Sequence, residues 1–309
     1  MSTSHFYPVG TPGVPWGEQE RLQWRERQLR SRSYETDVVS RVERLAGALE
    51  VVRYGQLSYG PDHYSLLALK SRDWNPALPV ALVTGGVHGY ETSGVMGALR
   101  FAEEQAPAYA GRMNVLVAPC VSPWAYERIC RWNYHAIDPN RNFGVHRHAE
   151  ESSALIELLT PHLGQFLLHI DLHETTNSDI TEFRPALASR DGKALEPETV
   201  PDGFYLVGDS ATTRLDFQIA IVEAVAKVTH IAPPDDEGKI IGFPLSAPGV
   251  IEFPVRSAGL CAGVTGARFT TTTEVYPDSP RTHAKECEEA QLAAVRAAFD
   301  FALEHAASP

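Results

Sequence analysis

A histidine and a glutamate three residues apart, His88 and Glu91, are the side chains of this sequence best suited to hold a metal ion. They follow a continuous apolar run at residues 80–83 and the two glycines Gly85 and Gly86, which allow a sharp turn. Imidazole nitrogen and carboxylate oxygen suit Zn²⁺, and two side chains at this spacing can reach one ion. Two ligands do not complete a site, so a third ligand, a base and substrate-binding groups must come from elsewhere in the chain.

His173 is the best candidate for the third metal ligand. It follows a second short apolar run, residues 166–172, much as His88 follows the first. Such runs are typical of buried parallel strands, and ligands of open α/β sheets bind at the carboxyl ends of those strands. The competing interpretation is a core histidine bonded to backbone. Other histidines are weaker candidates: His169 is expected to be buried with its own hydrogen bonds, and His146 and His148 are expected in a polar loop.

A second informative stretch, residues 131–143, is rich in arginine, asparagine and aromatic residues. Arginine can hold a carboxylate through two parallel hydrogen bonds, so Arg141, with Asn140 beside it, could bind an acidic end group. Asp138 is a candidate partner for a ligand imidazole, because such contacts fix the ring's tautomer. The alternative is a surface loop held by a structural salt bridge.

Alternating strands and helices must position these residues, which indicates a single α/β domain. Helices are predicted at residues 34–49, 92–104, 152–159, 212–229 and 288–305. Strands are predicted at residues 51–54, 64–70, 79–86, 113–121, 166–172 and 267–276. The Pro/Gly-rich residues 238–266 are expected to form a wall of the cleft. Residues 1–33 are predicted to be an irregular lead-in and a charged surface helix whose arginines form a solvated face rather than a binding patch, and residues 34–309 the catalytic domain.

The bulk composition describes an ordinary globular protein of 309 residues, with 43% hydrophobic and 21% charged residues. A formal net charge of -12 argues against a nucleic-acid partner, which favours a basic face. The four cysteines form no Cys-x-x-Cys pair, and neither a secretion signal nor a membrane-spanning segment is evident. We therefore expect a soluble, cytoplasmic protein without nucleic-acid or membrane partners; the oligomeric state is left open.

The ordered set of motifs resembles the zinc carboxypeptidases of the carboxypeptidase A superfamily over residues 34–305. It comprises His88-x-x-Glu91, then Asp138-x-Asn140-Arg141-Asn142-Phe143, then His173, then Glu274 on a late strand. The resemblance implies a single domain of the phosphorylase/hydrolase-like type. Its central sheet would be mixed but largely parallel, with helices on both faces.

The resemblance also implies a role for each matching residue. One zinc ion would be bound by His88, Glu91 and His173, with Asp138 supporting His88. Glu274 would be the general base and Arg131 the group that holds the oxyanion. The remaining pair, Asn140 and Arg141, would bind the terminal carboxylate of the substrate. Glu182 and Glu252 are rival bases, and Arg128 is a rival to Arg131.

The phrasing of two motifs is closer to another branch of that superfamily. Residues 88–92 and Asp171-Leu172-His173 resemble aspartoacylase and succinylglutamate desuccinylase, which remove an acyl group from an amino acid. The expected function is a zinc-dependent carboxypeptidase acting on a small peptide with a free carboxylate. The alternatives are an N-acyl-amino-acid deacylase and, less favoured, a catalytically inactive metal-binding relative.

Overall fold

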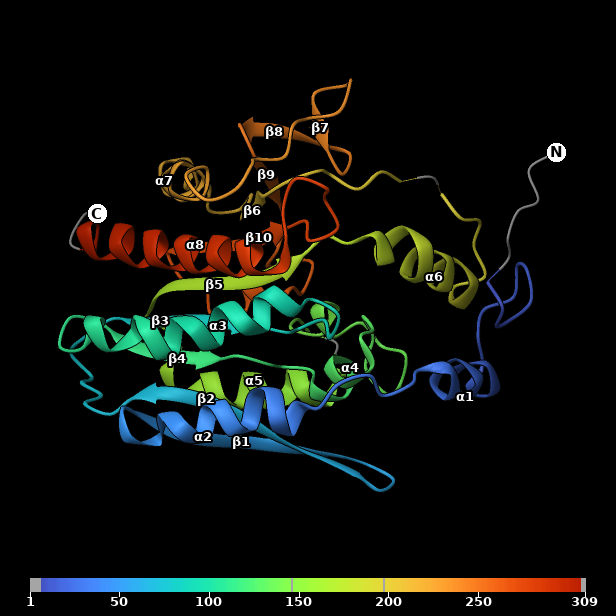
Figure 1. Cartoon of the computed structure of the whole chain (residues 1–309), viewed down its shortest axis with the longest axis horizontal. Helices are drawn as coiled ribbons and strands as arrows, with labels where there is room; N and C mark the ends of the chain where they lie inside the picture. Colours follow the sequence, from blue (N-terminus) through green and yellow to red (C-terminus); the bar gives the residue numbers. More distant parts are fainter. Residues whose placement is uncertain (1–6, 146, 197, 307–309) are drawn as a thin grey trace.

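The computed structural model describes residues 7–145, 147–196 and 198–306. Within them, ten strands form one sheet in the order β1-β2-β4-β3-β5-β10-β6-β9-β8-β7 (Figure 1). Their bounds are β1 Leu49–Tyr59, β2 Asp62–Ser71, β3 Val80–Gly85, β4 Asn114–Ala118, β5 Phe166–Glu174, β6 Tyr205–Asp209, β7 Lys239–Ile240, β8 Phe243–Ala247, β9 Val250–Phe253 and β10 Phe269–Val275.

The middle of the sheet is parallel and its flanks are mixed. Strands β4, β3, β5 and β10 run in one direction, whereas β1, β2, β6 and β8 each pair antiparallel with a neighbour. The carboxyl ends of β3, β5 and β10 therefore meet at one edge, with Thr84 opposite Asp171 and His173 opposite Glu274. The predicted mixed α/β sheet is confirmed.

Helices cover both faces of this sheet. Strand β3 shows why, because Ala81 and Val83 belong to one apolar core and Val80 and Leu82 to the other, so both faces are buried. Helices α2, α3, α7 and α8 lie over the first face and α5 over the second.

The helices are α1 Glu18–Arg27, α2 Ser40–Arg44, α3 Thr92–Glu104, α4 Pro123–Arg128, α5 Glu150–Leu159, α6 Arg184–Arg190, α7 Leu215–Val225 and α8 Ala284–Glu304. Short π or 3₁₀ segments are η1 Glu35–Val39, η2 Leu45–Gly47, η3 Ala106–Tyr109, η4 Pro139–Arg141, η5 Thr160–His162, η6 Asp179–Phe183 and η7 Cys261–Gly263.

The structure differs from the sequence prediction in several regions. The helix predicted at residues 34–49 is a succession of π, α and 3₁₀ turns, and β1 already begins at Leu49. Strand β6 and the small strands β7 to β9 were missed, since they are short and their region is rich in proline and glycine. The long hairpin β1–β2 extends well beyond the predicted strands, because its mixed polar and apolar residues give little hydrophobic signal.

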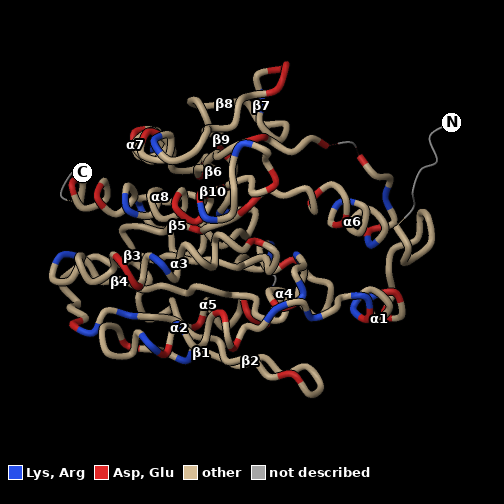
Figure 2. Tube along the Cα trace, in the orientation of Figure 1, with Lys and Arg blue, Asp and Glu red and all other residues tan. Residues whose placement is uncertain are grey.

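The N-terminal segment packs against the end of the molecule that carries α6, on the right in Figure 1. Trp16 N–H donates to the carbonyl of Arg190 at 2.8 Å, and the buried ring of Trp24 lies 5.5 Å from that of Trp132. Figure 2 shows basic and acidic positions mixed along α1. Arg21 and Arg25 donate to backbone carbonyls of His135 and Tyr134. Arg21 and Arg25 therefore contact the rest of the chain, whereas Arg27 and Arg30 are exposed to solvent.

None of the helices described is both long enough and apolar enough to span a bilayer.

Candidate metal centre

A tight turn after β3 presents the first two candidate ligands. Gly86 has a φ of +60°, which favours glycine, and a Cβ on Gly89 would lie only 2.0 Å from the backbone carbon of Ala125 in α4. The turn is therefore held against α4 by residues that have no room for a side chain. Glu91 stands at the N-cap of α3, which begins at Thr92 as predicted.

His88, Glu91 and His173 come together at the shared edge of β3 and β5. All three are at most 2% exposed, and one potential ligand atom from each lies within 4.8 Å of the others. Nδ1 of His88 lies 2.7 Å from Glu91 Oε1, and Nδ1 of His173 lies 2.8 Å from Glu91 Oε2. Both imidazoles thus present the same nitrogen to the one carboxylate.

The donor set fits a divalent cation. Glu91 Oε2 is a buried oxygen that finds no hydrogen-bond donor among the described residues, despite the short distance to His173. Such an unsatisfied oxygen is costly unless a cation or donor compensates it. Burial acts to raise the pKa of Glu91, but the two imidazoles outweigh it and hold that pKa at about 2. The carboxylate is therefore ionised and available as a ligand.

The other nitrogen of each imidazole meets a further carboxylate. Asp138 Oδ1 lies 3.0 Å from Nε2 of His88, and Asp171 Oδ2 lies 2.8 Å from Nε2 of His173. With an ion bound, these contacts would hold the proton of each ring on Nε2 and leave the lone pair of Nδ1 for the ion. Sequence reasoning proposed no role for Asp171. Its place two residues before His173 on a strand, and so on the same face, was the available signal.

Asp138 also organises the stretch that follows it. Its Oδ1 accepts from the backbone N–H of Asn140 at 2.9 Å, which caps the short helix η4. Asn140 is buried; its amide oxygen accepts from the N–H of Cys261 at 2.7 Å and its amide nitrogen lies 3.4 Å from His173 Nε2. Arg141 lines a cavity next to the candidate ligands, and its guanidinium donates to the carbonyl of Asn140.

Arg131 is fixed beside the metal centre by three partners. Its Nε donates to Asp138 Oδ2 at 3.2 Å, and Nη1 donates to Tyr90 Oη at 2.7 Å and lies 3.5 Å from Asp179 Oδ1. Burial acts to lower its pKa, but these neighbours outweigh it and raise the pKa well above its ordinary value. The rival Arg128 instead pairs with Asp62 at 2.8 Å on β2.

Glu274 lies on β10 directly opposite His173 on β5. Its Oε2 accepts from the Thr175 hydroxyl at 3.1 Å, and burial raises its pKa to about 8, which suits a group that takes up and releases a proton near neutral pH. The rivals are placed differently. Glu182 accepts from the Tyr7 hydroxyl and lines a separate cavity. Glu252 lies on β9 between Ile251 and Phe253, which line the cavity that contains Glu274, and is not itself part of that lining.

These groups surround a cavity of about 630 Å³, which is within the range of small-molecule sites. Its lining includes His88, His173, Arg131, Arg141 and Glu274. An apolar wall comes from the Pro/Gly-rich region predicted to form one. That wall includes Ile241, Phe243, Ile251, Phe253 and Leu260.

Among the described residues, the other histidines lie outside the three-residue cluster. His169 is fully buried, with Nε2 3.1 Å from the Thr84 hydroxyl and Nδ1 3.4 Å from that of Thr265, so it is the satisfied core histidine that the sequence predicted. His148 donates its backbone N–H to the side chain of Asn142. His146 lies outside the described residues.

The sequence matches no known family profile and no curated protein. Its structure, however, resembles solved metallopeptidases. A candidate metallopeptidase from Shewanella denitrificans OS217 shares 20% identity at a TM-score of 0.65, over 87% of this chain and 88% of that one. The carboxypeptidase A from Helicoverpa armigera shares 15% sequence identity at a TM-score of 0.59, over 94% of this chain and 81% of that one. A metallo-carboxypeptidase from Burkholderia cenocepacia shares 13% sequence identity at a TM-score of 0.56, over 95% of this chain and 70% of that one.

The protein has a carboxypeptidase-like fold. Identities this low establish the fold alone, so function is argued below from the site. The fold is the one that the resemblance of the sequence motifs implied.

Proposed function

We propose that this carboxypeptidase-like protein is a zinc-dependent hydrolase that cleaves the amide bond next to a free terminal carboxylate, with one ion per chain. The observation that carries the proposal is the arrangement around one cavity of three buried ligands, a carboxyl group opposite them and two arginines. His88, Glu91 and His173 would hold the ion. When bound, zinc supplies Lewis acidity and lowers the pKa of water.

Glu274 moves the proton in this proposal. It accepts a proton from the attacking water and then delivers it to the nitrogen of the leaving amine, as general base and then general acid. Its place opposite His173 and the hydroxyl of Thr175 hold the carboxyl group at the edge of the ligand cluster. The raised pKa favours proton retention between the two transfers.

Arg131 stabilises the negative charge that develops on the scissile carbonyl oxygen. Its guanidinium is held in advance by Asp138, Tyr90 and Asp179, so it need not reorganise during the reaction. Arg141 and the amide of Asn140 bind the terminal carboxylate and so place the amide bond. The size of the cavity and its apolar wall favour a small peptide over a short acyl amino acid.

Two substrate panels test this function in metal-loaded and chelator-treated protein. One contains N-blocked dipeptides with a free carboxylate, and the other contains N-acetyl and N-succinyl amino acids. We expect chelator-sensitive cleavage of the dipeptides, and loss of turnover with retained metal in Glu274→Gln. Cleavage of the acyl amino acids alone would make the protein a deacylase, and turnover that survives in Glu274→Gln would assign the base elsewhere.

A further inference from the structure

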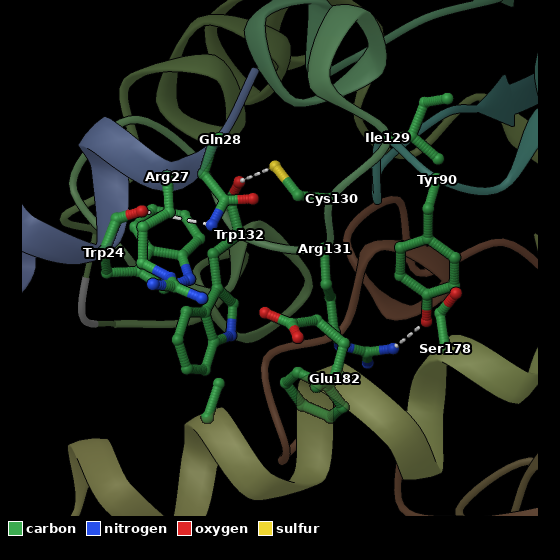
Figure 3. Close-up of a pocket in the computed structure, with 12 residues that line it drawn as sticks. Trp24, Arg27, Gln28, Tyr90, Ile129, Cys130, Arg131, Trp132, Ser178 and Glu182 are labelled. Carbon is green, nitrogen blue, oxygen red and sulfur yellow. Dashed lines mark hydrogen bonds between the residues drawn. The ribbon is translucent and has the colours of Figure 1, made fainter. Parts of the chain in front are cut away.

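A second cavity, of about 280 Å³, lies next to the metal centre (Figure 3). Four segments of the chain build it: α1 with the residue after it, Tyr90 in the turn after β3, the stretch that follows α4, and η6 with its flanking residues. The N-terminal helix, which the proposed reaction leaves without a role, thus forms a wall of a cavity beside the reacting groups.

One part of the wall of this cavity is aromatic, beside polar groups such as Arg27 and Glu182. The rings of Trp24 and Trp132 lie 5.5 Å apart, and Phe183 packs edge-on to Trp132 at 5.7 Å. Figure 3 shows Trp24 and Trp132 side by side and facing Glu182 across the cavity. An aromatic wall of this kind favours an apolar or aromatic group in the bound molecule.

One polar atom in that wall lacks a partner. Trp132 is only 2% exposed, and its indole Nε1 finds no hydrogen-bond acceptor among the described residues. Buried indole N–H groups usually have an acceptor, and leaving one unsatisfied carries a free-energy cost. A carbonyl oxygen of a bound molecule would supply the missing acceptor. Glu182, whose Oε1 accepts from the Tyr7 hydroxyl, lines the same cavity but makes no hydrogen bond to this indole.

Arg131 connects this cavity to the metal centre, because it lines both. Tyr90, bonded to Arg131 and two residues after His88, lines the second cavity, whereas Arg141 lines the first. If the scissile carbonyl meets Arg131 and the leaving carboxylate meets Arg141, the acyl side of the substrate extends away from Arg141. Because the second cavity shares Arg131 but not Arg141 with the first, we place the acyl side of the substrate toward it, and its volume suits one residue rather than a whole ligand.

We propose that the N-terminal helix completes a substrate-binding pocket for a residue on the acyl side of the cleaved bond, and that this pocket selects an aromatic or bulky apolar side chain. The inference rests on the proposed peptidase function. Trp24, Trp132 and Phe183 contact the side chain of that residue, and the indole N–H of Trp132 donates to a backbone carbonyl of the peptide.

The test uses N-acetylated tripeptides with one common terminal residue and full-length, metal-loaded protein. Each of the two residues before the cleaved bond is changed in turn from Ala to Phe. We expect kcat/KM to rise by about tenfold or more at one of them, since apolar groups in such pockets discriminate by roughly 10–200-fold. Trp24→Ala, which opens the pocket, and Gln28→Trp, which fills it from the end of α1, should each remove most of that preference.

Leu22→Ala is the matched control, because Leu22 is on the same helix, is 42% exposed and lies outside the cavity lining. It should keep the wild-type ratio of Phe to Ala peptides. Peptide cleavage with no Phe preference at either position, or a preference that persists in the pocket variants, would overturn the pocket and leave the proposed function standing. Failure to cleave any tripeptide or dipeptide would overturn the function and the pocket together.

Discussion

Arg32 is expected to be a main support of the metal-binding turn. Its guanidinium donates to the carbonyl of Gly89, to the hydroxyl of Thr92 and to the carbonyl of Tyr126, at 2.5, 2.7 and 2.6 Å. Gly89 and Thr92 flank the ligand Glu91 and lie close to His88. One side chain from the N-terminal segment therefore ties both ends of the turn to α4, and it also stacks 3.6 Å above the ring of Tyr126.

The magnitude follows from the contacts that Arg32→Met would remove. Methionine keeps an apolar stem but leaves two backbone carbonyls without this donor, at about 1–3 kcal/mol each. Loss of the cation–π contact adds about 1 kcal/mol. We expect the free energy of unfolding to fall by about 3–7 kcal/mol and the affinity for zinc to fall by about tenfold or more.

Urea unfolding of metal-free protein and zinc competition with a chelator measure the two effects. Arg30→Met is the matched control, since Arg30 is 50% exposed and its ion pairs with Asp62 and Glu127 do not touch the metal-binding turn. Arg30 is half exposed and solvent screens its pairs, although Glu127 is buried, so this variant should lose clearly less stability than Arg32→Met and no zinc affinity. If Arg32→Met matched Arg30→Met in both assays, the assigned role of Arg32 would be refuted.

Three further predictions follow from the site and its surroundings. Arg141→Ala should raise KM for substrates with a free carboxylate by about 10–100-fold with little change in kcat, because it removes a charge-assisted contact; an unchanged preference for the free acid over its amide would reject this role. Asp171→Asn should weaken zinc binding by about 10–100-fold, and chelator competition that shows wild-type affinity would contradict it. Burial raises the pKa of Glu151 to about 7, above the roughly 4.3 of an unfolded chain, so its stabilising contribution is present below about pH 4 and is lost as the pH rises through 7. Between pH 5 and pH 8, wild type should therefore lose roughly 2 kcal/mol more unfolding free energy than Glu151→Gln in urea titrations, and parallel curves would contradict this.

The candidate ligands could be predicted from the sequence because the physical signal is local. A continuous apolar run followed by two glycines predicts a buried strand and a turn, and the structure places β3 and the turn there. His173 could be found for the same reason, since its strand is also short and apolar. The position of Glu274 opposite His173 follows once β5 and β10 are parallel neighbours.

The rest depends on contacts between distant segments. The run of arginines near the N-terminus looks like a solvated face, because nothing nearby in the sequence reveals that Arg32 meets carbonyls 57 and 94 residues away. The cavity beside Arg131 is equally hidden, since α1, the stretch after α4 and η6 meet only in the folded chain. Asp171 lies within an apolar strand, and its role becomes evident only from its contact with the imidazole of His173.

The most direct test of the central claim is a zinc titration of chelator-stripped protein, with peptide hydrolysis measured at every step. We predict one tightly bound ion per chain, and activity that returns in proportion to its binding. Glu91→Gln and His173→Ala should lose both, because each removes one of three ligands. Tight binding that survives in those variants, or full hydrolysis by the stripped protein, would contradict the assignment of His88, Glu91 and His173 as the catalytic metal site.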